Sequence, residues 1–227
     1  MMDFSFKKQK IVCPVTGRVE GMEVLILNSK HEIFEMIDLD SVLLSQINHI
    51  KEIIFSGDYQ IMELFGSYIY LNIEPSQLVN SSLVRCLCEL ALILKRSETG
   101  LAIEITERYE EHISKRNIIQ SIKNLRAYGC KMGLDDFNER DDSRISIAGI
   151  LDEIDFIKVE VMHINDRLNG ILVKRNLELV VERVETINQK KQVERVIKGK
   201  FYLQGFLISK PMPFYSSLEK PLMLSKV

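Results

Sequence analysis

The 227-residue sequence has no excess of positive charge and no long hydrophobic run. It carries 30 lysines and arginines against 32 aspartates and glutamates, a formal net charge of −2. We therefore expect no direct nucleic-acid binding and no membrane association. The first eight residues lack the apolar stretch of a signal peptide, and Arg85 and Glu89 interrupt the most apolar region, 83–94. These features predict a cytoplasmic protein with one domain, residues 1–227.

Cysteine and histidine are too few and too scattered for the chemistry that they most often serve. The four cysteines have neither paired zinc spacing nor a disulfide-rich pattern, so we interpret them as reduced core residues. None of the four histidines lies within one helical turn of another. A histidine-ligated zinc site and a Ser-His-Asp relay are both disfavoured.

Short runs rich in Val, Ile and Leu alternate with longer, charged, amphipathic segments, a rhythm typical of strands that alternate with helices. The strand candidates are residues 21–27, 68–73, 101–106, 131–134, 155–159 and 178–182. The helix candidates are residues 41–65, with a break at Ser56-Gly57, and residues 83–95, 113–128 and 189–198. This order predicts a parallel α/β sheet, and periodicity alone leaves open whether the sheet is open or closed.

Acidic residues fall in or directly after several of these strands. They are Glu23, Glu104, Asp135, Asp136 and Glu182. Because alternate strand residues share a face, Glu104 lies with Ala102 and Thr106, opposite Ile103 and Ile105. In a closed barrel, Glu104 would then point into the mouth.

Acids in apolar strands are costly unless they are paired, hydrogen-bonded or bound to a metal. A surface or salt-bridged role would explain any one of them, but agreement across several strand ends favours ligands. Asn72 adds a neutral oxygen of the same orientation, and an all-oxygen set selects Mg²⁺ or Mn²⁺. Lys158 would either neutralise the acids or hold a metal-bound water near a phosphate. Such a site suits metal-assisted hydrolysis of a phosphodiester.

One of these assignments has an alternative. Glu178, Glu182 and Glu185 also fit the acidic stripe of a helix, paired with Arg175 or Arg183. The order of the other motifs favours a strand that ends at Glu182.

In that order, the motifs resemble those of the EAL family, which are cyclic di-GMP phosphodiesterase domains with a β/α barrel fold. The matching segments are Glu23-Val24-Leu25, Asn72, Glu104-Ile105-Thr106-Glu107, Asp135-Asp136-Phe137, Ile157-Lys158-Val159-Glu160, Glu182-Arg183-Val184-Glu185-Thr186, and Gln204-Gly205-Phe206 followed by Ser209-Lys210-Pro211. Each is short, but all seven occur in family order over nearly the whole chain. The resemblance implies a TIM-like (β/α) barrel of the EAL type.

The resemblance also implies roles for individual residues. The ligands of two metal ions, Mg²⁺ or Mn²⁺, would be Glu23, Asn72, Glu104, Asp135, Asp136 and Glu182. Lys158 would position the hydrolytic water, and Glu107, Glu185 and Gln204 would support the site. With all ten side chains present, the implied activity is hydrolysis of cyclic di-GMP to linear pGpG.

Several departures from the family pattern argue against that activity. Leu27 stands where the family has an arginine, Arg183 replaces a glycine, and Glu160 replaces an aspartate. The loop at 138–143 loses two glycines and gains three carboxylates, Glu139, Asp141 and Asp142. Since these acids would repel an anionic substrate, we expect cyclic di-GMP binding to be weak or absent.

The chain between Lys158 and Glu182 is about a dozen residues shorter than the family norm, roughly the length of one helix. We therefore expect the barrel helix between Val159 and Glu178 to be missing or reduced to a turn. The uncovered flank would then expose apolar surface to a partner.

Together these departures favour a divergent, non-catalytic EAL-like regulatory protein that acts by binding another protein. Some single-domain members of this kind bind the flagellar master regulator FlhDC and suppress motility, so the resemblance makes FlhDC the expected partner. The alternative is a working Mg²⁺- or Mn²⁺-dependent cyclic di-GMP phosphodiesterase, and it is supported by the complete ligand set. A third possibility is a sensor that binds metal or nucleotide without turnover.

Overall fold

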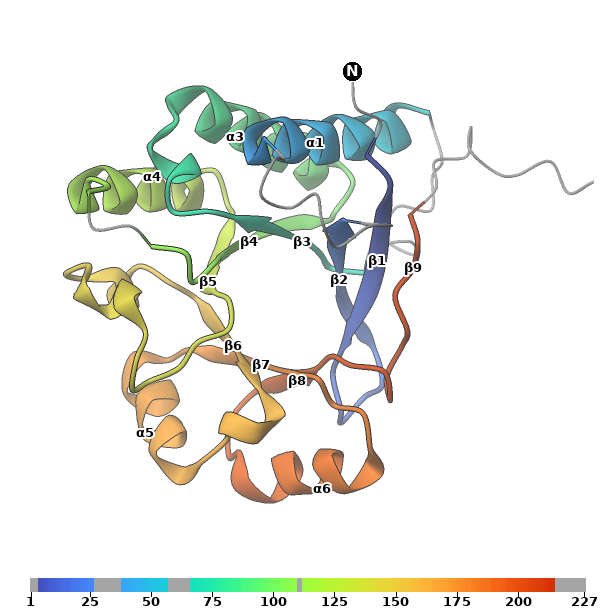
Figure 1. Cartoon of the computed structure of the whole chain (residues 1–227). Coiled ribbons are helices and arrows are strands. Elements are labelled where there is room, and N and C mark those ends of the chain that lie inside the picture. The colour runs from blue at the N-terminus through green and yellow to red at the C-terminus, as the bar shows by residue number, and fades with distance from the viewer. Residues whose placement is uncertain (1–3, 27–37, 57–65, 110–111, 215–227) are drawn as a thin grey trace, which may run out of the picture.

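Eight strands close into a barrel in the computed structural model, which describes residues 4–26, 38–56, 66–109 and 112–214 (Figure 1). The strands are β1 Phe6–Val12, β2 Val19–Ile26, β3 Tyr68–Ile73, β4 Gly100–Ile105, β5 Lys131–Leu134, β6 Phe156–Glu160, β7 Glu178–Glu182 and β8 Phe201–Leu203. β2 to β8 are parallel neighbours, and β1 closes the ring antiparallel to β2 and β8. A short ninth strand, β9 Met212–Pro213, pairs with β1. The predicted TIM-like barrel is confirmed.

Five described α-helices lie outside the ring (Figure 1). They are α1 Leu39–Phe55, α3 Ser81–Arg96, α4 Lys115–Ala127, α5 Asp166–Arg175 and α6 Ile187–Val196. The sequence explains several of their N-termini. The Asn80 side chain accepts the first free backbone N–H groups of α3, and Thr186 with Gln189 forms a reciprocal capping box at α6.

The predicted strands at 68–73, 131–134 and 178–182 coincide with β3, β5 and β7, and the other predicted elements agree within a few residues. Leu27 and the part of the predicted 41–65 helix beyond Ser56 lie outside the described residues. The sequence patterns did not identify β1, β8 or β9. Lysine and glutamine dominate the middle of β1, and β8 is only three residues long, so neither contains a clear apolar run.

The prediction of a missing helix between Val159 and Glu178 is wrong. α5 occupies this interval, because Asn165 caps its N-terminus and Asn176 ends it in the left-handed conformation, which keeps both connections short. Leu168 and Leu172 are the buried residues on its inner face. Among the connections between neighbouring parallel strands, it is β5 to β6 that lacks an α-helix; the chain there is fully described and forms two 3₁₀ turns, Ser143–Ser146 and Ile150–Asp152.

Alternate strand residues face the barrel axis and form two layers inside it. The lower layer is apolar and comprises Ile11, Tyr70, Ala102, Phe156, Val180 and Tyr202. Gly21 and Gly133 complete this layer on β2 and β5. A Cβ on either glycine would lie 2.5 Å from the Tyr70 ring or 2.3 Å from the Phe156 ring, so the two aromatic rings fill the space that the glycines leave.

None of the helices in the described ranges is long and apolar enough to cross a membrane. The largest apolar cluster lies between the outward strand faces and the helices, and it includes Ile103, Ile105 and Leu134.

Replacement of Gly133 by alanine tests this packing. We expect Gly133→Ala to lower the free energy of unfolding by about 1–3 kcal/mol, because its methyl group would overlap the Phe156 ring. The matched control is Gly170→Ala in α5, where nothing lies within 4 Å of the added Cβ. That change should raise stability by about 0.5–1 kcal/mol through helix propensity. Urea unfolding curves of both variants measure the difference, and equal stability of the two would contradict the layered interior.

Candidate active site

A layer of polar side chains lies directly above the apolar layer, at the end of the barrel where the parallel strands finish. Two residues beyond each apolar-layer position, the parallel strands or the residues that follow them carry Glu23, Asn72, Glu104, Asp135, Lys158, Glu182 and Gln204. The antiparallel strand β1 carries Gln9 two residues before Ile11, toward the same end. The prediction that Glu104 points into the barrel is confirmed, since its side chain is fully buried there.

The ammonium group of Lys158 lies at the centre of this layer. Its Nζ atom is 2.6 Å from Glu182 Oε1, 3.0 Å from Glu104 Oε2, 3.1 Å from Asp135 Oδ1 and 3.2 Å from Glu23 Oε2. Lys158 is 1% exposed, so these charges interact with little screening by water. One buried cation therefore joins acids from four other positions around the ring.

Two amides orient the Glu23 carboxylate. Asn72 Nδ2 donates to Oε1 at 2.8 Å, and Gln204 Nε2 donates to Oε2 at 2.5 Å. Gln204 Nε2 also lies 3.1 Å from Gln9 Oε1, and Gln9 donates to the backbone carbonyl of Ser209 at 2.9 Å. The sequence patterns missed Gln9, because β1 was not recognised as a strand. Its participation follows from the pairing of Gln9 with Glu23 across β1 and β2.

The electrostatics of the layer reflect its surplus of acids. Burial raises the pKa of Glu104 well above its ordinary value, and it raises the pKa of Glu182 to about 8. Burial also favours a higher pKa for Glu23, but Lys158 and the two amides outweigh burial and hold that pKa below its ordinary value. For Lys158, the surrounding carboxylates outweigh burial and raise the pKa well above its ordinary value.

The raised pKa of Glu182 has a defined effect on stability. The folded chain keeps a proton that the unfolded chain releases near the ordinary value of 4.5. Its contribution to stability is therefore fully present below about pH 4.5 and is lost as the pH rises through about 8.

The donor set fits a hard divalent cation. Among the described residues of this layer, four buried acceptor oxygens have no hydrogen-bond donor: Asn72 Oδ1, Glu104 Oε1, Gln204 Oε1 and Asp135 Oδ1, the last of which has only its ion pair with Lys158. All donors are oxygens, as Mg²⁺ and Mn²⁺ prefer. As the side chains stand, the described ranges contain no group of three or more acidic, histidine or cysteine side chains spaced to hold a metal. The carboxylates are instead drawn toward the Lys158 ammonium.

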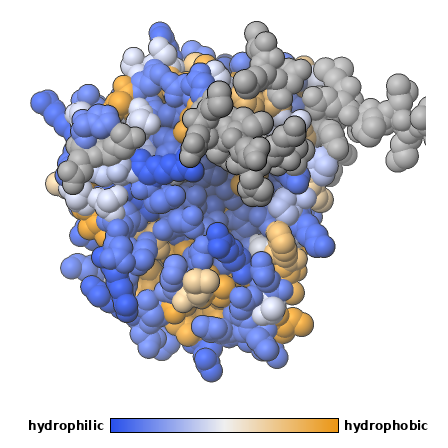
Figure 2. Space-filling view, viewed as in Figure 1, coloured by the Kyte–Doolittle hydropathy of each residue, from blue (hydrophilic) through white to orange (hydrophobic). Residues whose placement is uncertain are grey.

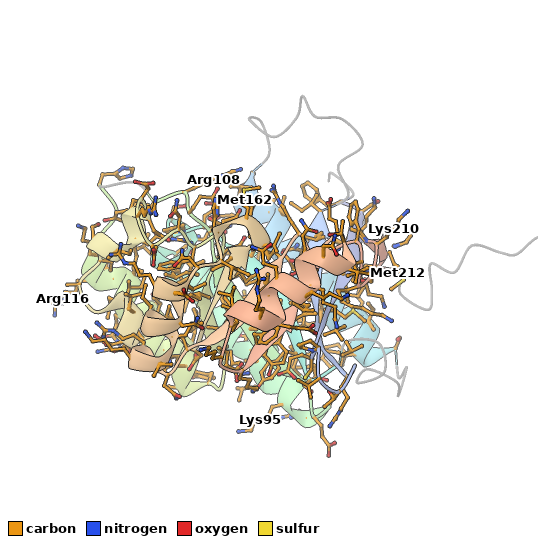
Figure 3. The ribbon with its side chains drawn as sticks, turned by 90° about the horizontal axis from the view of Figure 1, so that it is seen from below. Lys95, Arg108, Arg116, Met162, Lys210 and Met212 are labelled. Carbon is orange, nitrogen blue, oxygen red and sulfur yellow. The ribbon has the colours of Figure 1, made fainter. Side chains whose placement is uncertain are left out.

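A cavity of about 500 Å³ opens above the layer, and the remaining predicted residues lie at or near its rim. Asp136 and Glu185 line it, and both are exposed, as is Glu107. Partial burial of its carboxyl group, together with the charges of Asp135 and Glu107, raises the pKa of Asp136 although the residue as a whole is exposed. Figure 2 looks into this end of the barrel and shows hydrophilic residues across its middle. Figure 3 shows the barrel from the side, with Arg108 and Met162 at this end and Lys95 at the other.

The acidic loop at 138–143 turns one of its new carboxylates inward. Asp142 pairs with Arg144, which is fully buried, through contacts of 2.8 and 2.5 Å. Arg144 also donates to the backbone carbonyls of Ile105 and Asp135, at the ends of β4 and β5. Asp142 therefore does not present a free charge to the mouth, contrary to the expectation from the sequence. Arg144 carries no sequence signal that we recognised.

Arg183, which replaces a glycine of the family pattern, directly follows β7. The backbone there is left-handed, with φ of 53°, a conformation that favours glycine. The side chain does not fill the interior, because two thirds of it is exposed and Arg183 Nη1 lies 2.8 Å from Glu160 Oε1. The position of Leu27 lies outside the described residues.

Removal of the Lys158 charge tests the electrostatic role of this residue. We expect Lys158→Met to lower the free energy of unfolding by about 3–5 kcal/mol at pH 8, because two buried and two largely buried acids lose their counter-ion. The loss should be smaller at pH 5, where protons replace the ammonium, and Mn²⁺ should restore part of it at pH 8. Urea unfolding at both pH values measures the change.

Lys190→Met is the matched control, since Lys190 forms a partly exposed i,i+4 pair with Glu194 and should change stability by less than about 0.5 kcal/mol. Equal losses in the two variants at pH 8 would contradict the role given to Lys158.

Comparison with known proteins agrees with this geometry. The sequence model of the EAL domain family matches residues 3–211 of this chain. The EAL enzyme Bd1971, solved with cAMP and cyclic di-GMP, aligns with a TM-score of 0.70 at 19% identity, over 92% of this chain and 62% of that one. The PaMucR phosphodiesterase in complex with c-di-GMP aligns with a TM-score of 0.69 at 21% identity, over 93% and 98%. BlrP1 of Klebsiella pneumoniae, in a calcium and cyclic di-GMP complex, aligns with a TM-score of 0.70 at 25% identity, over 93% and 56%.

The chain therefore corresponds to part of Bd1971 and BlrP1 and to nearly all of the PaMucR structure. No curated protein matches it. Because the family match covers most of the sequence and the barrel agrees with it, we conclude that the chain belongs to the EAL-domain family.

Proposed function

We propose that this EAL domain is a divalent-cation-dependent phosphodiesterase that hydrolyses cyclic di-GMP to linear pGpG. The observation that carries the proposal is the buried acid layer, in which four carboxylates share one ammonium and several acceptor oxygens have no donor. Burying so many acids is costly unless a cation binds there. Among similar structures, the PaMucR phosphodiesterase was solved with c-di-GMP, and BlrP1 was solved with calcium or manganese and the same nucleotide.

The residues that would hold Mg²⁺ or Mn²⁺ are Glu23, Asn72, Glu104, Asp135, Asp136 and Glu182. When bound, such an ion neutralises charge on a phosphoryl oxygen and lowers the pKa of a coordinated water. Asn72 and Gln204 orient Glu23 by donating to its two oxygens, which leaves their own carbonyl oxygens free to accept. The surrounding carboxylates raise the pKa of Lys158, so its side chain is an ammonium in the metal-free layer. There it acts as a hydrogen-bond donor and a positive charge.

Two of the features that favoured a non-catalytic, partner-binding role differ in the folded chain. The charge of Asp142 is neutralised by Arg144 within the loop, and α5 occupies the interval expected to lack a helix. The acid layer, in contrast, brings Glu23, Glu104, Asp135 and Glu182 together around Lys158, and this arrangement supports metal-dependent hydrolysis. We therefore place hydrolysis ahead of a purely regulatory role.

A turnover assay tests the proposal. We expect the wild-type chain to convert cyclic di-GMP to linear pGpG in Mn²⁺, and Glu104→Gln to lower the rate by about a hundredfold or more, since Glu104 is buried at the centre of the donor set. Chromatography of the products measures both. Glu194→Gln on the exposed surface of α6 is the control and should retain the wild-type rate. Absence of product from the wild-type chain, together with no calorimetric binding of the nucleotide in Ca²⁺, would refute the proposed activity.

A second candidate function is regulation through binding of a protein, with FlhDC as the expected partner from the family resemblance. The observation that favours it is a group of exposed apolar side chains around the barrel mouth: Met162, Ile187 and Phe206 are 70%, 62% and 57% exposed. They follow three neighbouring strands, β6, β7 and β8. Figure 2 shows hydrophobic residues on the lower half of the face, over α5 and α6.

A pull-down with purified FlhDC, paired with a motility assay, tests this second function. If it holds, the wild-type chain retains FlhDC and lowers motility, and Met162→Ser with Phe206→Ser weakens retention by about tenfold, the loss expected for two buried apolar contacts. Val15→Ser is the control, because Val15 is 88% exposed in the turn at the other end of the barrel. No retention and unchanged motility would exclude FlhDC as the partner.

A further inference from the structure

Arg183 has an unfavourable backbone conformation at the barrel mouth. It directly follows Glu182, the last residue of β7, and its φ of 53° lies in the region that a side chain with a Cβ avoids. Such positions persist where the surrounding structure enforces them, and they concentrate at binding sites.

Arg183 is the accessible positive charge among the residues that line the mouth cavity. The lining carries five carboxylates, from Glu23, Asp135, Asp136, Glu182 and Glu185, and two cations, Lys158 and Arg183. Lys158 is 1% exposed and is surrounded by four of the acids of its layer. Two thirds of the Arg183 side chain, in contrast, is exposed. An anion entering the cavity would therefore meet Arg183 first.

Glu160 holds one edge of this guanidinium and leaves the rest available. Arg183 Nη1 lies 2.8 Å from Glu160 Oε1, and Glu160 is largely buried at the end of β6, where it pairs in register with Glu182. A guanidinium has five N–H donors in a rigid fork that matches the oxygens of a phosphate. One carboxylate contact fixes its direction, and the remaining donors can bind a second anion.

We propose that Arg183 is a substrate-binding residue that donates to a non-bridging phosphate oxygen of the nucleotide at the cavity mouth, with Glu160 as its positioning residue. This inference rests on the proposed function for the identity of the nucleotide. A purely structural role would instead consist of the Arg183–Glu160 pair alone, and a pair with so exposed a partner contributes little to stability.

Replacement of Arg183 by glycine separates the two roles, because the two effects have opposite signs. Glycine relieves the left-handed backbone, so the thermal unfolding midpoint of Arg183→Gly should be close to or above that of the wild-type chain. Loss of a charge-assisted phosphate contact should raise the Kd for cyclic di-GMP by about tenfold or more. Arg183→Lys should fall between the two, since an ammonium keeps the charge and loses the fork.

Calorimetric titration of the whole chain with cyclic di-GMP in Ca²⁺, at two salt concentrations, measures these changes. Arg116→Ala is the matched control, because Arg116 is exposed on α4 at the edge of the molecule (Figure 3), and its Kd should equal that of the wild type. The Arg183→Gly variant should also show a weaker dependence of Kd on salt. If the wild-type chain binds the nucleotide and Arg183→Gly binds it equally tightly, the role of Arg183 is refuted and the proposed function stands. If the wild-type chain does not bind it, the proposed function fails and Arg183 loses its assigned ligand with it.

Discussion

The ammonium of Lys158 is the interaction on which the upper half of the barrel depends. Its four carboxylate partners come from β2, β4 and β7 and from the residue that follows β5, so a single buried charge links strands on several sides of the ring. In a medium of low dielectric constant, such a group is stabilising only when every partner is in place. The resulting mutual dependence explains why the amides of Asn72 and Gln204 are also held in defined orientations.

The apolar layer beneath makes this arrangement possible. Tyr70 and Phe156 fill the barrel over the two glycines of β2 and β5, and they exclude water from the underside of the acid layer. The polar side chains above the two rings are therefore accessible only from the barrel mouth. The strand period of two residues converts this into a simple rule: an apolar residue or a glycine on each strand is followed, two positions toward the mouth, by a polar one.

Charge balance recurs around the mouth at a smaller scale. Asp142 is matched by the fully buried Arg144, and Glu160 is matched by Arg183. The first pair ties the 138–146 segment to the ends of β4 and β5, next to Glu104 and Asp135. The second leaves an exposed guanidinium above the acids. Two of the departures from the family pattern, Arg183 and Glu160, are thus partners of one another in the folded chain.

Local rules determined much of this protein from its sequence. Alternation within residues 101–106 placed Glu104 inside, the order of short motifs identified the barrel, and the all-oxygen donor set followed from the residue types.

What the tertiary structure decided depends on contacts between residues far apart in the chain. Gln9 meets Gln204 only because β1 closes the ring antiparallel, and Arg144 reaches the carbonyl of Ile105 only once the segment after β5 folds back over β4. Backbone geometry also decided two features. A left-handed conformation at Asn176 ends α5 within a short interval, and another at Arg183 directs its side chain outward. Periodicity and spacing report on neighbours a few residues apart, whereas these features arise from the closure of the barrel.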